Sequence, residues 1–357
     1  MKLYPLFFFS RYVRKVWGGK KLASLYHRNL PAENIGESWE ISDRPEASST
    51  VKNGPLQNKK LSELMQIYGK RITGSRITAA KPSESFPLLF KILTPKDRLS
   101  VQVHPGEKFA ETCQHASSKK EMWYVLEAEP GAKIIYGLKD RNISAEKVIK
   151  KAEQGQLENL LHRRPISRGE AIFIAPGMVH ALLGGAVIAE IQQNSDTTYR
   201  LYDWNRENSS REKRPLHLKK ALKTIKPDLN PYHSYFYPEF YTKNMWRLLS
   251  LCRSFTSYEL KVKKKEVLSP RELDSFIILF CQSGKLNLNY QQNHYQLTRG
   301  NCCLLPADLT RVEITGRADI LLFHRGYSGE EFRNLIKEKE LPAEKINRIP
   351  GAEHEYL

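Results

Sequence analysis

The chain has 357 residues, of which 40% are hydrophobic and 27% charged, a composition typical of a folded globular protein. No stretch approaches the ~20 consecutive apolar residues that cross a bilayer, so we expect no membrane-spanning helix. The net charge of +18 raises the question of a nucleic-acid partner. The basic residues are scattered, however, and their densest run, Lys261 to Lys265, has no interleaved aromatic residues. We therefore expect a solvated basic surface that attracts anionic metabolites, and no nucleic-acid partner.

The cysteines and the N-terminal segment indicate in which cellular compartment the protein is expected. The five cysteines are odd in number and form no C-x-x-C pair, which favours thiols in a reducing compartment. The apolar run near the N-terminus is interrupted by Pro5 and followed by Arg11 and Arg14, and it lacks the length and cleavage site of a signal peptide. These features predict a cytoplasmic protein.

The first two thirds of the chain show short strand patterns and two helical patterns. Leu61, Leu64, Met65 and Tyr68 follow i, i+3, i+4, i+7 spacing, which predicts a helix within an insertion at about 56–80. Ser144 is predicted as the N-cap of a second helical insertion at about 144–161. Apolar or alternating runs predict strands at 36–42, 86–93, 99–104, 122–126, 133–136, 170–175 and 186–191.

The last third is again strand-like, after a polar stretch at about 205–213, and it repeats a pattern from the first part. Segment 274–279 precedes a glycine by the same spacing as segment 121–126, and 299–306 resembles 168–176. Two similar β-sandwiches are predicted. The second copy has Thr310 at the position of a histidine in the first, so we expect it to be structural and free of metal.

We therefore expect a mainly β protein in three parts. Residues 1–235 form a metal-binding β-domain that carries the two helical insertions. Residues 236–328 form a second, metal-free β-domain, and 329–357 form a C-terminal tail that begins as a charged amphipathic segment.

Four residues of the first domain are candidate metal ligands: Gln102, His104, Glu121 and His180. Gln102 and His104 face the same side of a strand because side chains alternate along it. A single histidine in a strand is more often a satisfied polar residue than a ligand. The joint placement of one carboxylate and two imidazoles, each in or beside a strand, favours a metal site instead, with zinc or another borderline divalent cation.

The order of these motifs resembles that of a cupin, and the chain resembles the type I phosphomannose isomerases in their compact bacterial form. The resemblance is specific over about residues 4–206 and looser beyond. The matching segments are Trp17–Gly19, Gly36–Trp39, Phe90–Leu93, Leu99–Pro105, Glu121–Tyr124, Ala175–His180 and Gln193–Arg206.

The resemblance implies two cupin-like β-sandwich or jelly-roll domains and one zinc per chain, held by Gln102, His104, Glu121 and His180. It implies that the enzyme interconverts mannose 6-phosphate and fructose 6-phosphate through a cis-enediol. The implied catalytic residues are Arg200 and Glu190, the second as a proton-transfer group. The implied substrate-binding residues are Lys91, Ser100, Arg206 and one of the pair Lys119 and Lys120. The chain departs from the family in Arg206, where larger members carry lysine, and in Gly106-Glu107, where compact members often carry two acids.

Two other classes stay open at this point. One is a different metal-cupin enzyme such as an iron oxygenase, which a two-histidine, one-carboxylate set would suit. The other is a non-catalytic cupin that binds a sugar phosphate or a nucleic acid, which the net charge of +18 motivates. The glutamine in the candidate ligand set disfavours the first, and the intact set with Arg200 and Glu190 disfavours the second. The sequence does not define the oligomeric state.

Overall fold

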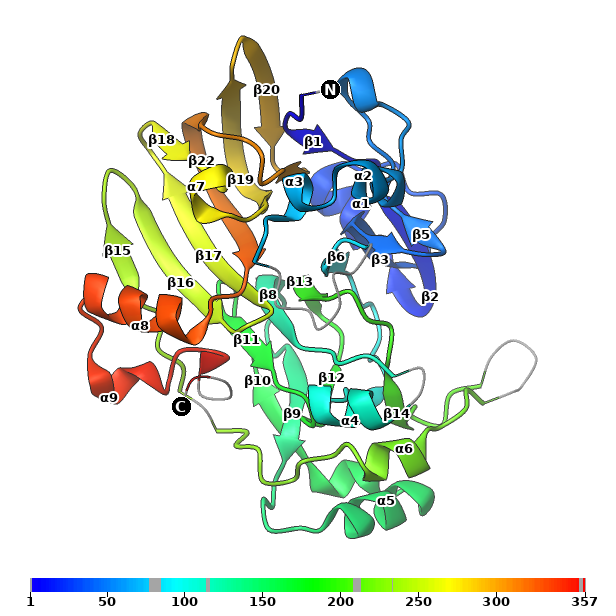
Figure 1. Cartoon of the computed structure of the whole chain (residues 1–357). Helices are drawn as coiled ribbons and strands as arrows, with labels where there is room; N and C mark the ends of the chain where they lie inside the picture. Colours follow the sequence, from blue (N-terminus) through cyan, green and yellow to red (C-terminus); the bar gives the residue numbers. More distant parts are fainter. Residues whose placement is uncertain are drawn as a thin grey trace. The chain divides into compact units, whose positions relative to one another are not determined.

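The computed structural model describes residues 2–76, 85–113, 116–207, 213–232, 234–352 and 356. The chain divides into two compact units. The first comprises Met1–Arg11, Trp39–Phe90 and Tyr235–Leu357, and the second Tyr12–Ser38 and Lys91–Ser234. Antiparallel strands dominate the fold, which confirms the mainly β class (Figure 1). The expected boundaries at 235 and 328 stay a prediction, because each unit is assembled from separate stretches of chain.

Two sheets build the part of the fold that holds the candidate site. The six-stranded sheet has the order β11 (Ala171–Ile174), β8 (Glu121–Ala128), β13 (Ala186–Gln193), β6 (Leu88–Leu93), β3 (Ile35–Ile41), β2 (Arg11–Gly19). The five-stranded sheet has the order β10 (Leu161–Pro165), β9 (Lys133–Leu138), β12 (His180–Leu182), β7 (Val101–Val103), β14 (Tyr199–Tyr202).

The two sheets share a buried hydrophobic cluster. It takes Trp123 and Ile172 from the six-stranded sheet and Ile134, Tyr136 and Leu182 from the five-stranded one. The sheets therefore pack as a sandwich, with one face of each turned toward the other.

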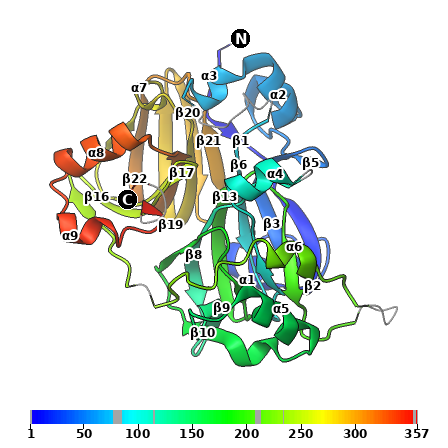
Figure 2. The same cartoon turned by 60° about the horizontal axis from the view of Figure 1, so that its bottom comes forward.

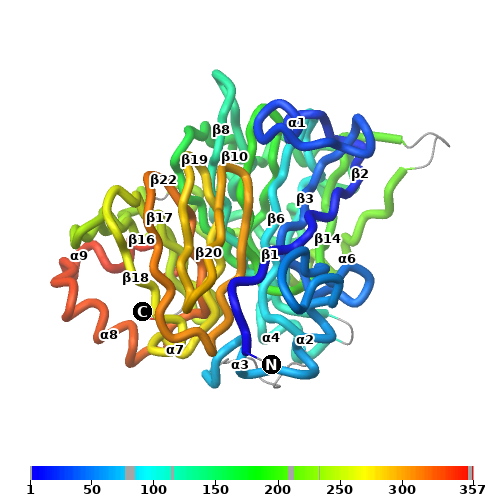
Figure 3. The backbone as a smooth tube through the Cα atoms, turned by 90° about the horizontal axis from the view of Figure 1, so that it is seen from above, coloured from blue at the N-terminus to red at the C-terminus, as the bar shows by residue number. Residues whose placement is uncertain are grey.

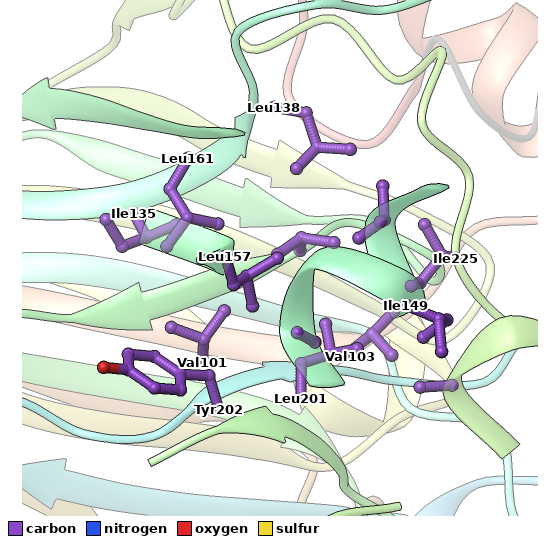
Figure 4. Packing of buried hydrophobic residues seen from close by; sticks show 14 of the residues in the cluster. Val101, Val103, Ile135, Leu138, Ile149, Leu157, Leu161, Leu201, Tyr202 and Ile225 are labelled. Atoms are coloured by element: carbon purple, nitrogen blue, oxygen red, sulfur yellow. The ribbon is translucent and has the colours of Figure 1, made fainter. Parts of the chain in front are cut away.

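The outer face of the five-stranded sheet is covered by helices. Val101 and Val103 of β7 are fully buried in a cluster with Leu157, Ile149 and Leu201 (Figure 4). This cluster also receives residues of α5 (Ala145–Glu153), η2 (Leu157–Leu160) and α6 (Leu218–Leu222). Because side chains alternate along β7, Gln102 lies on the opposite, inner face. This confirms the expectation that Gln102 faces away from Val101 and Val103.

We expect Leu201→Ala to lower the free energy of unfolding by about 2–5 kcal/mol, because Leu201 is fully buried and its removal leaves a cavity between sheet and helices. Urea unfolding followed by circular dichroism measures the loss. The matched control is Leu216→Ala, whose side chain is exposed, with an expected change within about 0.5 kcal/mol. Equal effects of the two substitutions would contradict the assignment of Leu201 to the core.

The first unit contains a nine-stranded sheet. Its main path runs β1 (Leu6–Phe7), β21 (Cys302–Leu305), β19 (Ile277–Tyr290), β22 (Val312–Arg325), β17 (Phe255–Val262), β16 (Met245–Leu251), β15 (Glu239–Tyr241). In addition, β18 (Glu266–Leu268) pairs with β22, and β20 (Asn293–Thr298) pairs with β19. Figure 3 shows β1, at the blue end of the chain, beside strands from its orange end.

The internal repeat predicted from the sequence has a structural counterpart. In the first copy, β8 pairs with β11, and Trp123 lies opposite Ile172. In the second copy, β19 pairs with β21, and Leu279 lies opposite Cys303. The corresponding segments of both copies thus form the same antiparallel pair.

The helical expectations are largely confirmed. Helix α2 occupies Leu61–Tyr68, and the second insertion holds α5 and η2. The end of the first insertion, 77–80, lies outside the described residues, as do residues 208–212 of the polar stretch. The tail begins with α8 (Gly329–Glu338), capped by Ser328 and Glu331. The sequence did not predict α1 (Lys21–Tyr26) or α4 (Glu107–Thr112). The remaining short elements are β4 (Asp43–Arg44), β5 (Ala47–Ser48), η1 (Gly54–Leu56), α3 (Lys70–Thr73), α7 (Pro270–Leu273) and α9 (Ala343–Ile346).

Two expectations from composition can be checked against the described residues. No helix in these parts of the chain has both the length and the apolar character needed to cross a bilayer. None of the five cysteines, all within the described ranges, takes part in a disulfide.

Candidate metal centre

Three side chains from the two sheets meet in the interior of the sandwich. His104 follows β7, His180 begins β12, and Glu121 begins β8. One ligand atom from each lies within 4.8 Å of the others. Each imidazole Nε2 is 3.4 Å from one oxygen of Glu121, and none of the three residues is more than 1% exposed.

Backbone carbonyls fix the orientation of both histidine rings. His104 Nδ1 lies 3.1 Å from the carbonyl oxygen of Thr197, and His180 Nδ1 lies 2.8 Å from that of Met178. A carbonyl oxygen only accepts, so each Nδ1 carries the proton and each Nε2 is an unprotonated acceptor with a lone pair. Both lone pairs are directed toward the carboxylate group of Glu121.

The electrostatics of the site keep the two histidines neutral and Glu121 ionised. Burial lowers the pKa of His104 to about 3, helped by the nearby Lys119 ammonium. Burial also lowers the pKa of His180, against the attraction of Glu121. Burial by itself would raise the pKa of Glu121, but the positive charge of Lys119 outweighs it and holds that pKa well below its usual range.

Gln102 completes this group from the middle of β7. Its backbone is the direct cross-strand partner of His180 on one side and of Arg200 on the other. Cross-strand partners share a face, so Gln102, His180 and Arg200 form a row on the inner face of the five-stranded sheet. The Gln102 Nε2 atom lies 3.2 Å from His180 Nε2. Rotating the amide by half a turn presents its oxygen to the same point.

The adjacent lysines occupy different positions, which the sequence could not distinguish. Lys119 Nζ lies 2.9 Å from an oxygen of Glu121 and 3.2 Å from His104 Nε2. Lys120 Nζ instead pairs with Glu107 at 2.7 Å. The structure therefore brings Lys119 to the candidate metal centre.

A second buried pair lies on the same face of the six-stranded sheet. Glu190 of β13 is the cross-strand partner of Trp123, two residues along β8 from Glu121. Lys91 of β6 lies 3.0 Å from Glu190 Oε1, and Trp123 Nε1 donates a hydrogen bond of 3.0 Å to Oε2. Glu190 is only 3% exposed, so it is a buried carboxyl group and not a charge at an exposed strand edge.

This pair is electrostatically asymmetric. Burial raises the pKa of Glu190 to about 7, with the Glu121 carboxylate adding to the shift and Lys91 opposing it. Burial would lower the pKa of Lys91, but the attraction of Glu190 and other acids outweighs it and raises that pKa. Lys91 is therefore the cation of the pair, and Glu190 is a carboxyl group that titrates near neutral pH.

The remaining predicted residues lie near β7 and β14. Arg200 is half-buried, and its Nε has no hydrogen-bond partner among the described residues. Ser100 is 5% exposed, and its hydroxyl makes no hydrogen bond within the same set. Alternation places Ser100 on the face of β7 that carries Gln102. Arg206 instead donates to Asp203 Oδ1 at 2.6 Å, and Arg214 also donates to this carboxylate.

Several contributors were not predicted from the sequence. The Thr197 and Met178 carbonyls belong to the backbone, so no residue type signals them. Nothing in the sequence around Trp123 indicates its hydrogen bond to Glu190. Asp203 lies within the family-like segment 193–206, but only the fold brings Arg214 to it.

The residues present fit a divalent cation. Among the described residues, neither oxygen of the buried Glu121 carboxylate accepts a hydrogen bond, although Lys119 is close. Two neutral imidazoles turn their Nε2 lone pairs toward it, so three acceptors converge. The cation now nearest to them is the Lys119 ammonium, 2.9 Å from Glu121 and 3.2 Å from His104 Nε2. Ligand atoms at about 2.0–2.1 Å from a tetrahedral zinc are roughly 3.3–3.4 Å apart. The two Nε2–oxygen distances of 3.4 Å match that spacing.

A small β-sandwich whose inner walls gather His, Glu and His side chains is the architecture of the cupin class. Comparison with known families agrees. The model of the phosphomannose isomerase type I catalytic domain matches residues 6–131, and that of the mannose-6-phosphate isomerase cupin domain matches residues 245–325.

Curated relatives and solved structures extend this similarity over most of the chain. The mannose-6-phosphate isomerase of Streptococcus mutans is 32% identical over 324 residues, which are 90% of this chain and 98% of that protein. The mannose-6-phosphate isomerase ManA of Bacillus subtilis is 30% identical over 321 residues, again 90% and 98%. A crystal structure of the Bacillus subtilis mannose 6-phosphate isomerase has a TM-score of 0.81 at 30% identity and covers 90% of this chain and 100% of that one.

The chain therefore belongs to the type I phosphomannose isomerase family, which is a family of enzymes. This confirms the resemblance inferred from the sequence motifs and the cupin fold.

Proposed function

We propose that this protein is a zinc-dependent isomerase that interconverts mannose 6-phosphate and fructose 6-phosphate in the cytoplasm. The observation that carries the proposal is the convergence of His104, Glu121 and His180, with both Nε2 lone pairs directed at a buried carboxylate. The names of the relatives at 30–32% identity support the substrate.

The proposed metal ligands are His104 Nε2, His180 Nε2, a carboxylate oxygen of Glu121 and the amide oxygen of Gln102. When bound, a divalent ion acts as a Lewis acid that stabilises negative charge on the sugar oxygens, a contribution of several kcal/mol. The hydrogen bonds from both Nδ1 atoms to backbone carbonyls hold the rings in place. Because Nδ1 carries the proton of each neutral ring, the metal-binding Nε2 stays unprotonated.

Glu190 is the proposed proton-transfer group. It would move a proton between C1 and C2 of the sugar, and this transfer interconverts the two sugar phosphates through a cis-enediol. Its raised pKa near 7 allows it to be deprotonated when it accepts a proton and to be protonated when it returns one. Trp123 and Lys91 hold its two oxygens in a fixed orientation. A water molecule is the rival for this role.

The residues proposed to bind the substrate's oxygen atoms are Arg200, Ser100, Lys91 and Lys119. Arg200 offers an Nε with no partner in the described residues, and a guanidinium suits paired contacts to phosphate or carboxylate oxygens. We propose Arg206 and Lys120 as supporting residues that act through Asp203 and Glu107, with which they pair.

A coupled assay for mannose 6-phosphate turnover, run with and without a chelator, tests the proposal. We expect turnover that a chelator abolishes and that added zinc restores, together with about one zinc per chain in the purified protein. Full turnover by zinc-free protein would contradict the proposed zinc dependence. If zinc-bound protein converted neither sugar phosphate, the proposed substrate would be wrong.

A further inference from the structure

The first unit contains a cavity of about 720 Å³ on one face of the nine-stranded sheet. Its floor includes Tyr258 and Leu322, which lie opposite each other on β17 and β22. On the next strand, Leu248 of β16 lies opposite Tyr258. Trp246 and His324 lie two residues from Leu248 and Leu322 along their strands, so they share this face. Helix α8, which runs beside these strands in Figures 1 and 2, contributes Leu335 to the lining.

The cavity lining includes a buried histidine with one ring nitrogen that has no hydrogen-bond partner among the described residues. His324 is 3% exposed, and its Nδ1 lies 2.6 Å from the carbonyl oxygen of Arg325, so Nδ1 is the donor and Nε2 an acceptor. Burial lowers the pKa of this histidine to about 4, so the ring is neutral at physiological pH. Nothing in the described part of the chain hydrogen-bonds to Nε2. Polar atoms of buried side chains are normally hydrogen-bonded, so a ligand hydroxyl is a suitable partner for this nitrogen.

The rings around this histidine favour a sugar over a nucleobase. Trp246 and Tyr258 are nearly perpendicular, at 86°, with centroids 5.8 Å apart. Tyr258 is already stacked on His324 at 5.8 Å. The two rings leave no parallel slot for a flat base, whereas their faces suit the C–H surface of a pyranose. The hydroxyls of Tyr258 and Tyr327, 3.4 Å apart, add donors and acceptors.

The lining also carries unpaired positive charge. Lys243 and Arg311 are exposed and form no ion pair with any described residue. The lining has two acids: Glu338 pairs with the lining residue Lys339 at 2.6 Å, and Glu266, which accepts a hydrogen bond from the neutral Asn244 Nδ2 at 3.1 Å, keeps its charge but is outnumbered by Lys243 and Arg311. The cavity therefore presents a surplus of cations to an anionic group.

We propose that this cavity is a second ligand site, separate from the candidate metal centre, that binds a phosphorylated sugar. The sugar ring lies against Trp246 and Tyr258, a hydroxyl donates to His324 Nε2, and the phosphate contacts Lys243 and Arg311. The volume lies within the usual range for small-molecule sites. The site does not depend on the proposed isomerase activity.

The test uses methyl glucoside 6-phosphate, whose locked ring cannot be isomerised, titrated into the full-length protein. The readout is the indole N–H signal of Trp246 in an NMR spectrum of protein labelled at its five tryptophans, assigned with Trp246→Phe. We expect a saturable shift of this signal. We expect the double variant Lys243→Ala/Arg311→Ala to weaken binding at this signal at least about tenfold, because it removes two charged contacts.

The matched control is Lys264→Ala/Arg333→Ala, which removes the same charge from exposed residues outside the cavity and should leave both the shift and the isomerase activity unchanged. All four residues of the two double variants are exposed, so neither variant should impair folding. No shift of the Trp246 signal at millimolar probe would overturn the site. An equal affinity for methyl glucoside without phosphate, or an equal loss in both double variants, would overturn the assignment of the ligand as a phosphorylated sugar.

Discussion

Replacing His104 with alanine is expected to abolish both metal binding and turnover. The substitution removes one of two imidazole lone pairs directed at Glu121 and leaves the carboxylate beside a cavity. Loss of residues that only support a ligand typically costs 10–100-fold in metal affinity or activity, so we expect the loss of a direct ligand to exceed about 100-fold. Metal analysis of the purified variant and the coupled isomerase assay measure the two effects.

The control for this variant is His294→Ala, an exposed histidine of β20 whose Nδ1 lies 2.7 Å from Asn289 Oδ1. It should retain metal and full activity. If the His104 variant kept one metal per chain and wild-type turnover, the candidate centre would have been wrongly placed. A variant that kept metal but lost turnover would instead assign His104 a role in contacting substrate.

Glu190→Gln is expected to lower kcat by about 10²–10⁴-fold while leaving the metal content unchanged. The amide has the size of the carboxyl group, but it cannot accept the proton. The buried Lys91 loses its partner, so we also expect a lower free energy of unfolding, of the order seen when a buried ion pair is broken, about 3–5 kcal/mol. Because kcat is measured on the folded fraction of the variant, the lower free energy of unfolding cannot explain the fall in kcat.

The pH dependence gives a second readout for Glu190. A base must be deprotonated to act, so kcat/KM should rise with pH through the pKa of Glu190 and reach its plateau above it. Burial raises this pKa from the ordinary 4.5 to about 7, so the rising limb should lie well above the range of an exposed glutamate. In Glu190→Gln, the residual activity should lack this limb. Glu127→Gln, a less buried carboxyl on the neighbouring strand β8, should keep both the limb and kcat. An unchanged limb in the Glu190 variant would assign the proton transfer to another group.

The sequence predicted those parts of the site that depend on local pattern. Alternation along 101–104 was enough to place Gln102 and His104 on one face, because the period of a strand is the same wherever it occurs. Lys91 lies within the predicted strand 86–93, and a lysine in an apolar run is expected to have a partner because a lysine is rarely buried alone. The structure supplies that partner as Glu190, which is separated from Lys91 by most of the domain.

The parts that could not be predicted depend on strand pairing across the fold. Lys119 and Lys120 precede β8, so the alternation of that strand does not extend to them, and the choice between them depends on the path of the chain before Glu121. The carbonyl groups that orient the histidines belong to loops whose path is set by tertiary packing. Similarly, the division into units follows from pairing between distant segments, so a linear reading of the chain could not yield it.

The pairing of β1 with β21 has a consequence for how the protein assembles during synthesis. Leu6 lies opposite Leu304, so the first strand leaves the ribosome about three hundred residues before its partner exists. The interval exposes an unpaired apolar edge, including Phe8 and Phe9, to other nascent chains and to chaperones. A fragment that begins near residue 236 would meet the opposite problem, because the edge of β21 would lack the strand that closes it.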